Sequence, residues 1–113
     1  MTLADTSVWA DHFRYGNPRL RELLEAGEVC MHPMILGELA CGSLPQREFT
    51  LQLLQDLPTA PEVTDEIVMQ TIERRGLWGR GIGWVDAQLL CAALVFGASL
   101  WTLDRSLALL AAL

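Results

Sequence analysis

Short apolar segments alternate with helical patterns along this chain, and that alternation limits the fold more than any other feature of the sequence. Residues 1–4, 29–31 and 98–103 are short, apolar and typical of strands. Helical patterns, most of them bounded by proline or glycine, cover 6–13, 18–26, 33–41, 45–57, 64–75 and 84–96, and a last helix begins at 104 or 105. Because strands that alternate with helices run parallel and are covered on both faces, the sequence predicts an α/β domain with a parallel sheet.

The length and composition favour one compact domain over residues 1–113. Hydrophobic residues make up 51% of the chain, which is too many for a disordered protein. The longest apolar run, residues 89–103, is interrupted by Gly97, Ser99 and Thr102, so we expect no membrane-spanning helix. The N-terminus lacks the basic and apolar regions of a signal peptide, so we expect a cytoplasmic protein.

The charged residues exclude several classes of site. The net charge is −6, and all eight basic residues are arginine. Without lysine the chain has neither a phosphate-binding P-loop nor a catalytic lysine. The acidic balance argues against sequence-independent binding of nucleic acid, but it is compatible with an enzyme that holds phosphates through metal ions.

The cysteines and histidines show no metal-binding spacing. Cys30, Cys41 and Cys91 form no C-x-x-C pair and have apolar neighbours, so we expect buried, reduced thiols. His12 and His32 are isolated from each other, so we interpret them as surface or core residues and not as zinc ligands.

Four carboxylates stand at distinctive positions in the predicted elements. Asp5 directly follows the first strand and Asp104 directly follows the last, so parallel strands would bring both to the same edge of the sheet. Glu38 lies beside Ile35 on an apolar helix that has no other charge, so we expect the helix to be largely buried. Taken singly, each aspartate is compatible with a helix cap and the glutamate with a solvated face.

Asp86 begins a helix, residues 84–96, that is apolar nearly all round and is therefore predicted to be buried. The helix dipole would stabilise an aspartate in the first turn by about 0.3–1 kcal/mol, which is less than the cost of burying an unpaired carboxylate. If Asp86 is buried, it therefore requires a cation.

A divalent metal ion would neutralise such a set of acids. Carboxylates held close together repel one another and their pKa values rise unless a cation is present, and no lysine is available. Hard oxygen ligands with open positions suit Mg²⁺ or Mn²⁺, which bind substrate phosphates and activate water. The residue pattern thus indicates phosphoryl-transfer chemistry.

Four motifs carry a family resemblance, namely ADTSVW with Asp5, ILGELACG with Glu38, GIGWVDAQLL with Asp86 and LWTLDRSL with Asp104. In order, spacing and flanking residues they resemble the four acidic motifs of the PIN domain, and the likeness is greatest to VapC-type toxins of prokaryotic type II toxin–antitoxin systems. The resemblance covers essentially the whole chain. It implies a three-layer α/β/α domain with a mainly parallel sheet and a Mg²⁺- or Mn²⁺-dependent endoribonuclease.

The resemblance also implies roles for individual residues. Asp5 and Asp86 would be metal ligands, and Glu38 and Asp104 would complete the cluster directly or through water. Thr6 and Thr102 occupy small hydroxyl positions that would orient ligands. Such toxins are usually homodimers, and a cognate VapB-type antitoxin covers the acidic groove. Many members have a final strand after the last helix, and residues 1–113 contain no segment for it.

An RNA substrate requires positive charge near the acids. We expect some of the arginines that flank the acidic motifs to contact phosphate, the candidates being Arg14, Arg74, Arg75, Arg80 and Arg105. Trp78 and Trp84 are candidates for stacking on an unpaired base, with core or dimer packing as the alternative.

Three other functions compete with a ribonuclease. An aspartyl-phosphate enzyme is disfavoured because Ser7, not an acid, stands two residues after Asp5 and lysine is absent. A non-catalytic PIN-fold binding or dimerisation module is a second alternative, and a nuclease acting on DNA is a third.

Overall fold

The computed structural model describes residues 1–112 of the chain. Three strands and seven helices lie within that range. In chain order they are β1 (Thr2–Ala4), α1 (Thr6–Tyr15), α2 (Pro18–Glu25), β2 (Val29–Cys30), α3 (Pro33–Ala40), α4 (Arg47–Gln55), α5 (Asp65–Arg75), α6 (Trp84–Phe96), β3 (Ser99–Trp101) and α7 (Arg105–Ala111). Element types and order follow the sequence prediction.

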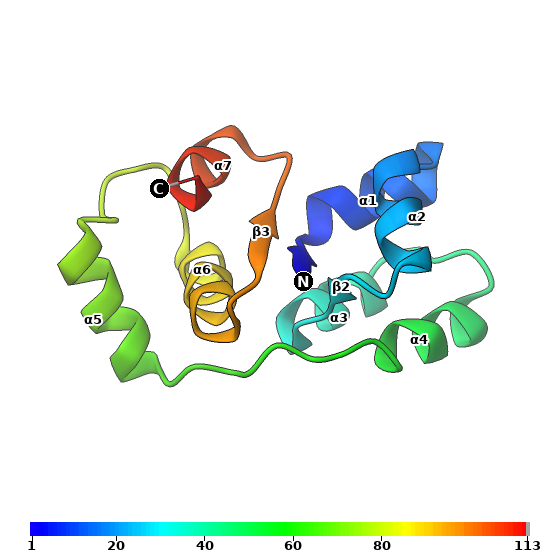
Figure 1. Cartoon of the computed structure of the whole chain (residues 1–113), viewed down its shortest axis with the longest axis horizontal. Coiled ribbons are helices and arrows are strands. Elements are labelled where there is room, and N and C mark those ends of the chain that lie inside the picture. The colour runs from blue at the N-terminus through cyan, green and yellow to red at the C-terminus, as the bar shows by residue number, and fades with distance from the viewer. Residues whose placement is uncertain (113) are drawn as a thin grey trace.

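The strands form one parallel sheet with the order β2-β1-β3. Leu3 in the central strand pairs with Cys30 on one side and Leu100 on the other. Figure 1 shows α1 and α2 on one face of this sheet and α6 on the other. The predicted parallel sheet in a three-layer α/β/α arrangement is therefore confirmed.

Local signals in the sequence set most helix ends. The side chains of Asn17 and Thr64 cap α2 and α5 at their first turns, and Gly76 and Gly97 end α5 and α6 in the left-handed conformation. The predicted helix at residues 45–57 begins later, at Arg47, because the backbone of the preceding Gln46 is left-handed with φ 45°.

The main core lies between the sheet and the helices on its two faces. Leu3, Val8, Leu20 and Ile35 are fully buried there. A separate apolar cluster joins Leu77, Leu90 and Leu110, so the loop after α5 packs together with α6 and α7. Because β1 and β3 pair in parallel, their ends and the residues that follow them lie at one edge of the sheet.

Three burial predictions are wrong. Only the central turns of α6 are buried, and residues at both of its ends are exposed, with Val95 63% exposed. The last strand is shorter than predicted and lies at the sheet edge, so Ser99 is exposed and Leu103, beyond the strand, is exposed too. Cys41 is exposed, because it follows α3 on the surface, whereas Cys30 and Cys91 are buried as expected.

His32 is a buried helix cap whose protonation should destabilise the fold. Its Nδ1 accepts a hydrogen bond of 3.0 Å from the backbone N–H of Met34 at the start of α3. Burial lowers the pKa of His32 from the ordinary value of 6.5, and Glu62 opposes this shift. The unfolded chain therefore binds more protons than the folded chain as pH falls below 6.5, so stability is complete above that pH and falls as pH drops towards the folded pKa.

We expect the urea midpoint to be lower at about pH 5.5 than at about pH 7.5. His32→Asn keeps an oxygen that can accept from Met34 but does not titrate, so its midpoint should fall less over the same interval. Part of the fall should persist, because burial and the nearby Arg21 also lower the pKa of His12. An unchanged pH dependence in His32→Asn would show that His32 is not responsible.

Candidate functional site

Asp5 is held at the point where β1 becomes α1. Its backbone N–H donates 2.9 Å to the carbonyl of Trp101 in β3, which continues the sheet by one residue. Its carboxylate caps α1 by accepting from the backbone N–H of Val8 at 3.3 Å. The side chain is buried, with 7% of Asp5 exposed. A carboxylate is thus fixed at the carboxyl edge of the central strand.

Ser7 joins this turn to the turn after β3. Its hydroxyl donates to Oδ1 of Asp5 and accepts 3.0 Å from the backbone N–H of Leu103. Asp104 is the next residue, so one hydroxyl connects the Asp5 turn with the backbone that leads to Asp104. The expected parallel strands are confirmed, but Thr102 and Leu103 separate Asp104 from the end of β3.

Asp104 caps α7 in the way that Asp5 caps α1. Its Oδ1 accepts 2.9 Å from the backbone N–H of Leu107. Its own N–H donates 3.0 Å to the hydroxyl of Thr102, whose residue is only 7% exposed. A buried threonine therefore shapes the turn that presents the exposed Asp104.

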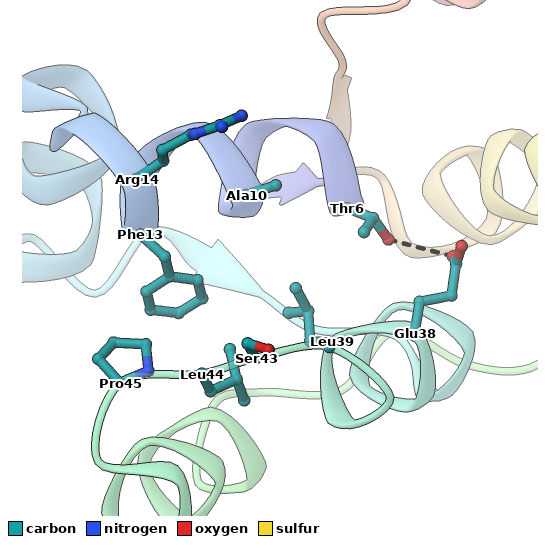
Figure 2. A pocket seen from close by; sticks show the side chains of 10 residues that line it. Thr6, Ala10, Phe13, Arg14, Glu38, Leu39, Ser43, Leu44 and Pro45 are labelled. Carbon is teal, nitrogen blue, oxygen red and sulfur yellow. Dashed lines mark hydrogen bonds between the residues drawn. The ribbon is translucent and has the colours of Figure 1, made fainter.

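Glu38 lies across a cleft from the start of α1. Thr6 donates a hydrogen bond of 3.1 Å from its hydroxyl to Oε1 of Glu38, as Figure 2 shows. The prediction that this helix, α3, is largely buried is wrong. Only the face of α3 that carries Ile35 and Leu39 packs on the core, and Glu38 lies on the exposed face.

The cleft beside Glu38 has a volume of about 560 Å³. Figure 2 shows Thr6 and Glu38 at one end and Phe13, Leu44 and Pro45 at the other. Arg14, one of the predicted phosphate contacts, is among the cleft residues and stacks on Tyr15, with its Cζ 5.6 Å from the ring centre. The other four candidates, Arg74, Arg75, Arg80 and Arg105, are exposed and lie outside this cleft.

Asp86 is half-buried at the start of α6. Its Oδ2 accepts 3.2 Å from the backbone N–H of Gly83. The premise that this carboxylate is fully buried is wrong, because the first turn of α6 reaches the surface at Trp84 and Val85. A cap and partial hydration therefore account for its position, and burial alone does not require a cation there.

The four acids do not converge into one cluster in this conformation. Within residues 1–112, no group of three or more His, Cys, Asp or Glu side chains lies close enough to hold a metal ion. The structure instead connects Asp5 to the Asp104 turn through Ser7, and Glu38 to Thr6. Asp86 has its own link, to Gly83.

The donor chemistry nevertheless fits a hard cation. In the described part of the chain the ion pairs are those of the N-terminus with Glu28 and of Arg19 with Glu22, so none of the four acids is neutralised by an ion pair there. Asp5 in particular is buried and receives hydrogen bonds from a hydroxyl and a backbone amide. A divalent cation would stabilise a buried carboxylate of that kind, and oxygen ligands suit Mg²⁺.

Ser7 is the residue at this site that the sequence prediction missed. The sequence signal was present, because a serine two residues after an aspartate can bond back to it in a turn. The second bond, to Leu103, is 96 residues away in sequence and no local pattern indicates it.

Replacing Ser7 by alanine should destabilise the protein by about 1–3 kcal/mol, because a carboxylate and a backbone N–H each lose a hydrogen bond. If Asp5 holds a metal ion, apparent affinity for Mg²⁺ should also fall about 10- to 100-fold, as it does when a group that orients a ligand is removed. Urea unfolding and Mg²⁺ titration measure the two effects. Ser99→Ala, at an exposed serine of β3, is the matched control and should change neither.

Comparison with known proteins identifies the family. The PIN domain family model matches residues 2–113. This chain belongs to the PIN domain family. The four predicted acidic motifs all lie within the matched range.

A named relative shows which group of PIN-domain proteins this chain resembles. It is 51% identical over 108 residues to Ribonuclease VapC32 of Mycobacterium tuberculosis strain H37Rv, and equally to the protein of the same name in strain CDC 1551. The alignment covers 95% of this chain and 87% of the relative. The PIN-domain chain is therefore VapC-like, as its motifs indicated.

Proposed function

We propose that this PIN-domain protein is a divalent-metal-dependent endoribonuclease and the toxin of a VapBC-type toxin–antitoxin pair. The single observation that carries the proposal is 51% identity, over 95% of the chain, to a protein named a ribonuclease of the VapC type. The carboxylates that follow β1 and β3, Asp5 and Asp104, support it, because they are oxygen donors with no ion-pair partner in the described residues. We further propose that residues 1–113 act as a single domain in the cytoplasm.

The proposed metal ligands are Asp5 and Asp86, with Glu38 and Asp104 completing the site and Mg²⁺ or Mn²⁺ as the ion. When bound, the ion would polarise the phosphodiester and lower the pKa of a nearby water. Within the described residues, no three of these acids lie close enough together to hold a metal ion. Binding of the ion should therefore draw their side chains together. The exposed Glu38 and Asp104 are free of core packing and have the room to move.

The protein's own residues orient the acids and the substrate. Ser7 holds Asp5 through its hydroxyl, and Thr6 holds Glu38. Thr102 shapes the turn before Asp104. Arg14 offers a guanidinium to a phosphate at the cleft that also contains Glu38. Together these residues would hold an RNA strand across the carboxylates.

Two protein partners are proposed. An apolar groove of about 340 Å³ between α1, α2 and α4 contains Trp9, Phe13 and the 53%-exposed Leu53, and it supports binding of a VapB-type antitoxin. Exposed apolar side chains at the end of α6, including Val95 and Phe96, support a homodimer. None of the helices in residues 1–112 has the length and hydropathy to span a bilayer.

Cleavage assays on RNA and DNA test the proposal. The purified chain should cut single-stranded RNA in the presence of Mg²⁺ or Mn²⁺, stop when EDTA is added, and leave single-stranded DNA of the same sequence intact. Cleavage of DNA alone would favour the DNA nuclease. Binding of RNA with no cleavage in either metal would favour the non-catalytic module.

A further inference from the structure

A third and smaller hollow, a cleft, lies at the start of α6 beside Asp86. It is formed by the end of α5, the loop of residues 76–83 and the first turn of α6, and its volume is about 210 Å³. Ile72, Leu77, Ile82 and Ala87 supply its buried and half-buried apolar wall, and Trp78 and Trp84 stand at its exposed rim. In Figure 1 this region lies at the end of the molecule away from α4.

The two tryptophans are unusually open to solvent for residues of their size. Trp78 is 65% exposed and Trp84 is 40% exposed, although an aromatic side chain normally buries most of its surface. Both line the same cleft, so their rings offer flat apolar surfaces beside one small cavity. Such surfaces suit a planar ligand that stacks.

The loop that carries Trp78 is held against the proposed catalytic elements. Gly81 has φ 82°, and a Cβ built there would lie 3.0 Å from the hydroxyl of Ser106 in the first turn of α7, the helix capped by Asp104. Gly83, another residue of the cleft, donates its N–H to Asp86. The cleft is therefore fixed next to Asp86 and near the start of α7.

Three arginines lie on the segments that form this cleft, the end of α5 and the loop after it. Arg74, Arg75 and Arg80 are three of the eight arginines, lie within seven residues of sequence and are exposed. In the described part of the chain none of them forms an ion pair with a carboxylate. Exposed guanidinium groups next to aromatic faces are the combination that binds a single nucleic-acid strand, with phosphates on the arginines and bases on the rings.

We propose that this cleft is a subsite for one unpaired RNA base next to the bond that is cut. The base stacks on Trp78 or Trp84, and the neighbouring phosphates contact Arg74, Arg75 or Arg80. This inference rests on the proposed ribonuclease function and adds a site that selects unpaired over base-paired RNA, because a paired base cannot leave its stack to enter the cleft.

Binding of short fluorescent RNAs tests the subsite. The probes are a single-stranded oligouridylate, an oligoadenylate and an abasic ribose-phosphate chain of the same length, each measured by fluorescence anisotropy in EDTA so that cleavage cannot interfere. The wild-type chain should bind the base-containing RNAs more tightly than the abasic chain. Trp78→Ala and Trp84→Ala should weaken binding of base-containing RNA about 5- to 150-fold and leave abasic binding unchanged.

Matched variants separate stacking from other effects. Trp78→Phe keeps an aromatic face and should retain most of the affinity. Phe49→Ala removes an equally exposed aromatic residue, 62% exposed on α4, and should have no effect. Light scattering on each variant reports whether the tryptophans hold two copies together. Far-UV circular dichroism should show an unchanged fold, since both rings are exposed.

The outcomes distinguish this inference from the proposed function. If the wild-type chain cleaves RNA with metal but both tryptophan variants bind every probe as it does, only the subsite is wrong. Equal weakening for base-containing and abasic chains, or loss of a dimer in the tryptophan variants, would also overturn it. Absence of cleavage by the wild-type chain would overturn the function, and absence of RNA binding by the wild-type chain would overturn the subsite whatever the cleavage assay gives.

Discussion

Replacing Asp5 by asparagine is expected to reduce metal-dependent RNA cleavage by at least about 100-fold, because even the loss of a group that merely orients a metal ligand costs about 10- to 100-fold. Asp86→Asn should have an effect of the same order. Asparagine is as good a helix cap as aspartate. At position 5 it can still accept a hydrogen bond from the N–H of Val8, and at position 86 from the N–H of Gly83. The substitutions therefore remove charge with little change in local structure.

Single-turnover cleavage at several Mg²⁺ concentrations measures the loss. Asp56→Asn changes an exposed aspartate at the end of α4 and should cleave RNA as the wild type does. If Asp5→Asn or Asp86→Asn retained wild-type activity, that residue would not be a ligand at the catalytic centre.

Stability provides a second readout that does not depend on activity. Because Mg²⁺ would bind the folded chain and not the unfolded one, it should raise the unfolding temperature of the wild type. Asp5→Asn should lose this increase. In EDTA the variant should be at least as stable as the wild type, because a buried charge with no ion-pair partner in the described residues has been removed.

Trp9→Ala is expected to lower the free energy of unfolding by about 3–5 kcal/mol, a large part of the roughly 5–15 kcal/mol that holds a domain folded. Trp9 is 2% exposed, belongs to the main core and stacks on Phe13 with ring centres 5.8 Å apart. Alanine would leave a cavity between α1 and its neighbours that the surrounding helices can fill only in part.

Trp9→Phe separates the contribution of the aromatic ring to stability from that of the indole N–H. Nε1 of Trp9 is buried with no hydrogen-bond partner among the described residues, so the wild type already bears the cost of desolvating that group. Phenylalanine keeps an aromatic ring beside Phe13 and removes the unpaired N–H, so the loss should be at most about half that of alanine. Trp78→Ala, at an exposed tryptophan, should change stability by no more than about 0.5 kcal/mol.

Urea unfolding at pH 7 would measure these differences. A loss in Trp9→Phe equal to that in Trp9→Ala would mean that Nε1 has a partner, such as a buried water, that contributes to stability. Loss of stability in Trp78→Ala comparable to Trp9→Ala would contradict the exposed position of Trp78.

Sequence alone determined the order of elements and the chemical character of the candidate site. Local rules were sufficient for that, because these features depend only on neighbouring residues. They include the helix starts at Asn17 and Thr64, the helix end at Gly97 and the alternation of short apolar runs with helices. Parallel strands followed from the same alternation, and they brought Asp5 and Asp104 to one edge of the sheet.

Tertiary structure alone decided which side chains are buried and how the acids are linked. The patterns of α3 and α6 indicated buried helices, yet Glu38 is exposed and Asp86 only half-buried, because hydrophobicity along a helix does not reveal which of its turns pack on the core. The bond from Ser7 to Leu103 joins residues far apart in sequence, so it exists only once β1 and β3 are paired. The sequence therefore identified the candidate carboxylates. The packing of the sheet decided how Asp5 is connected to the turn before Asp104, because the Ser7 hydrogen bonds that join them need contacts between distant segments.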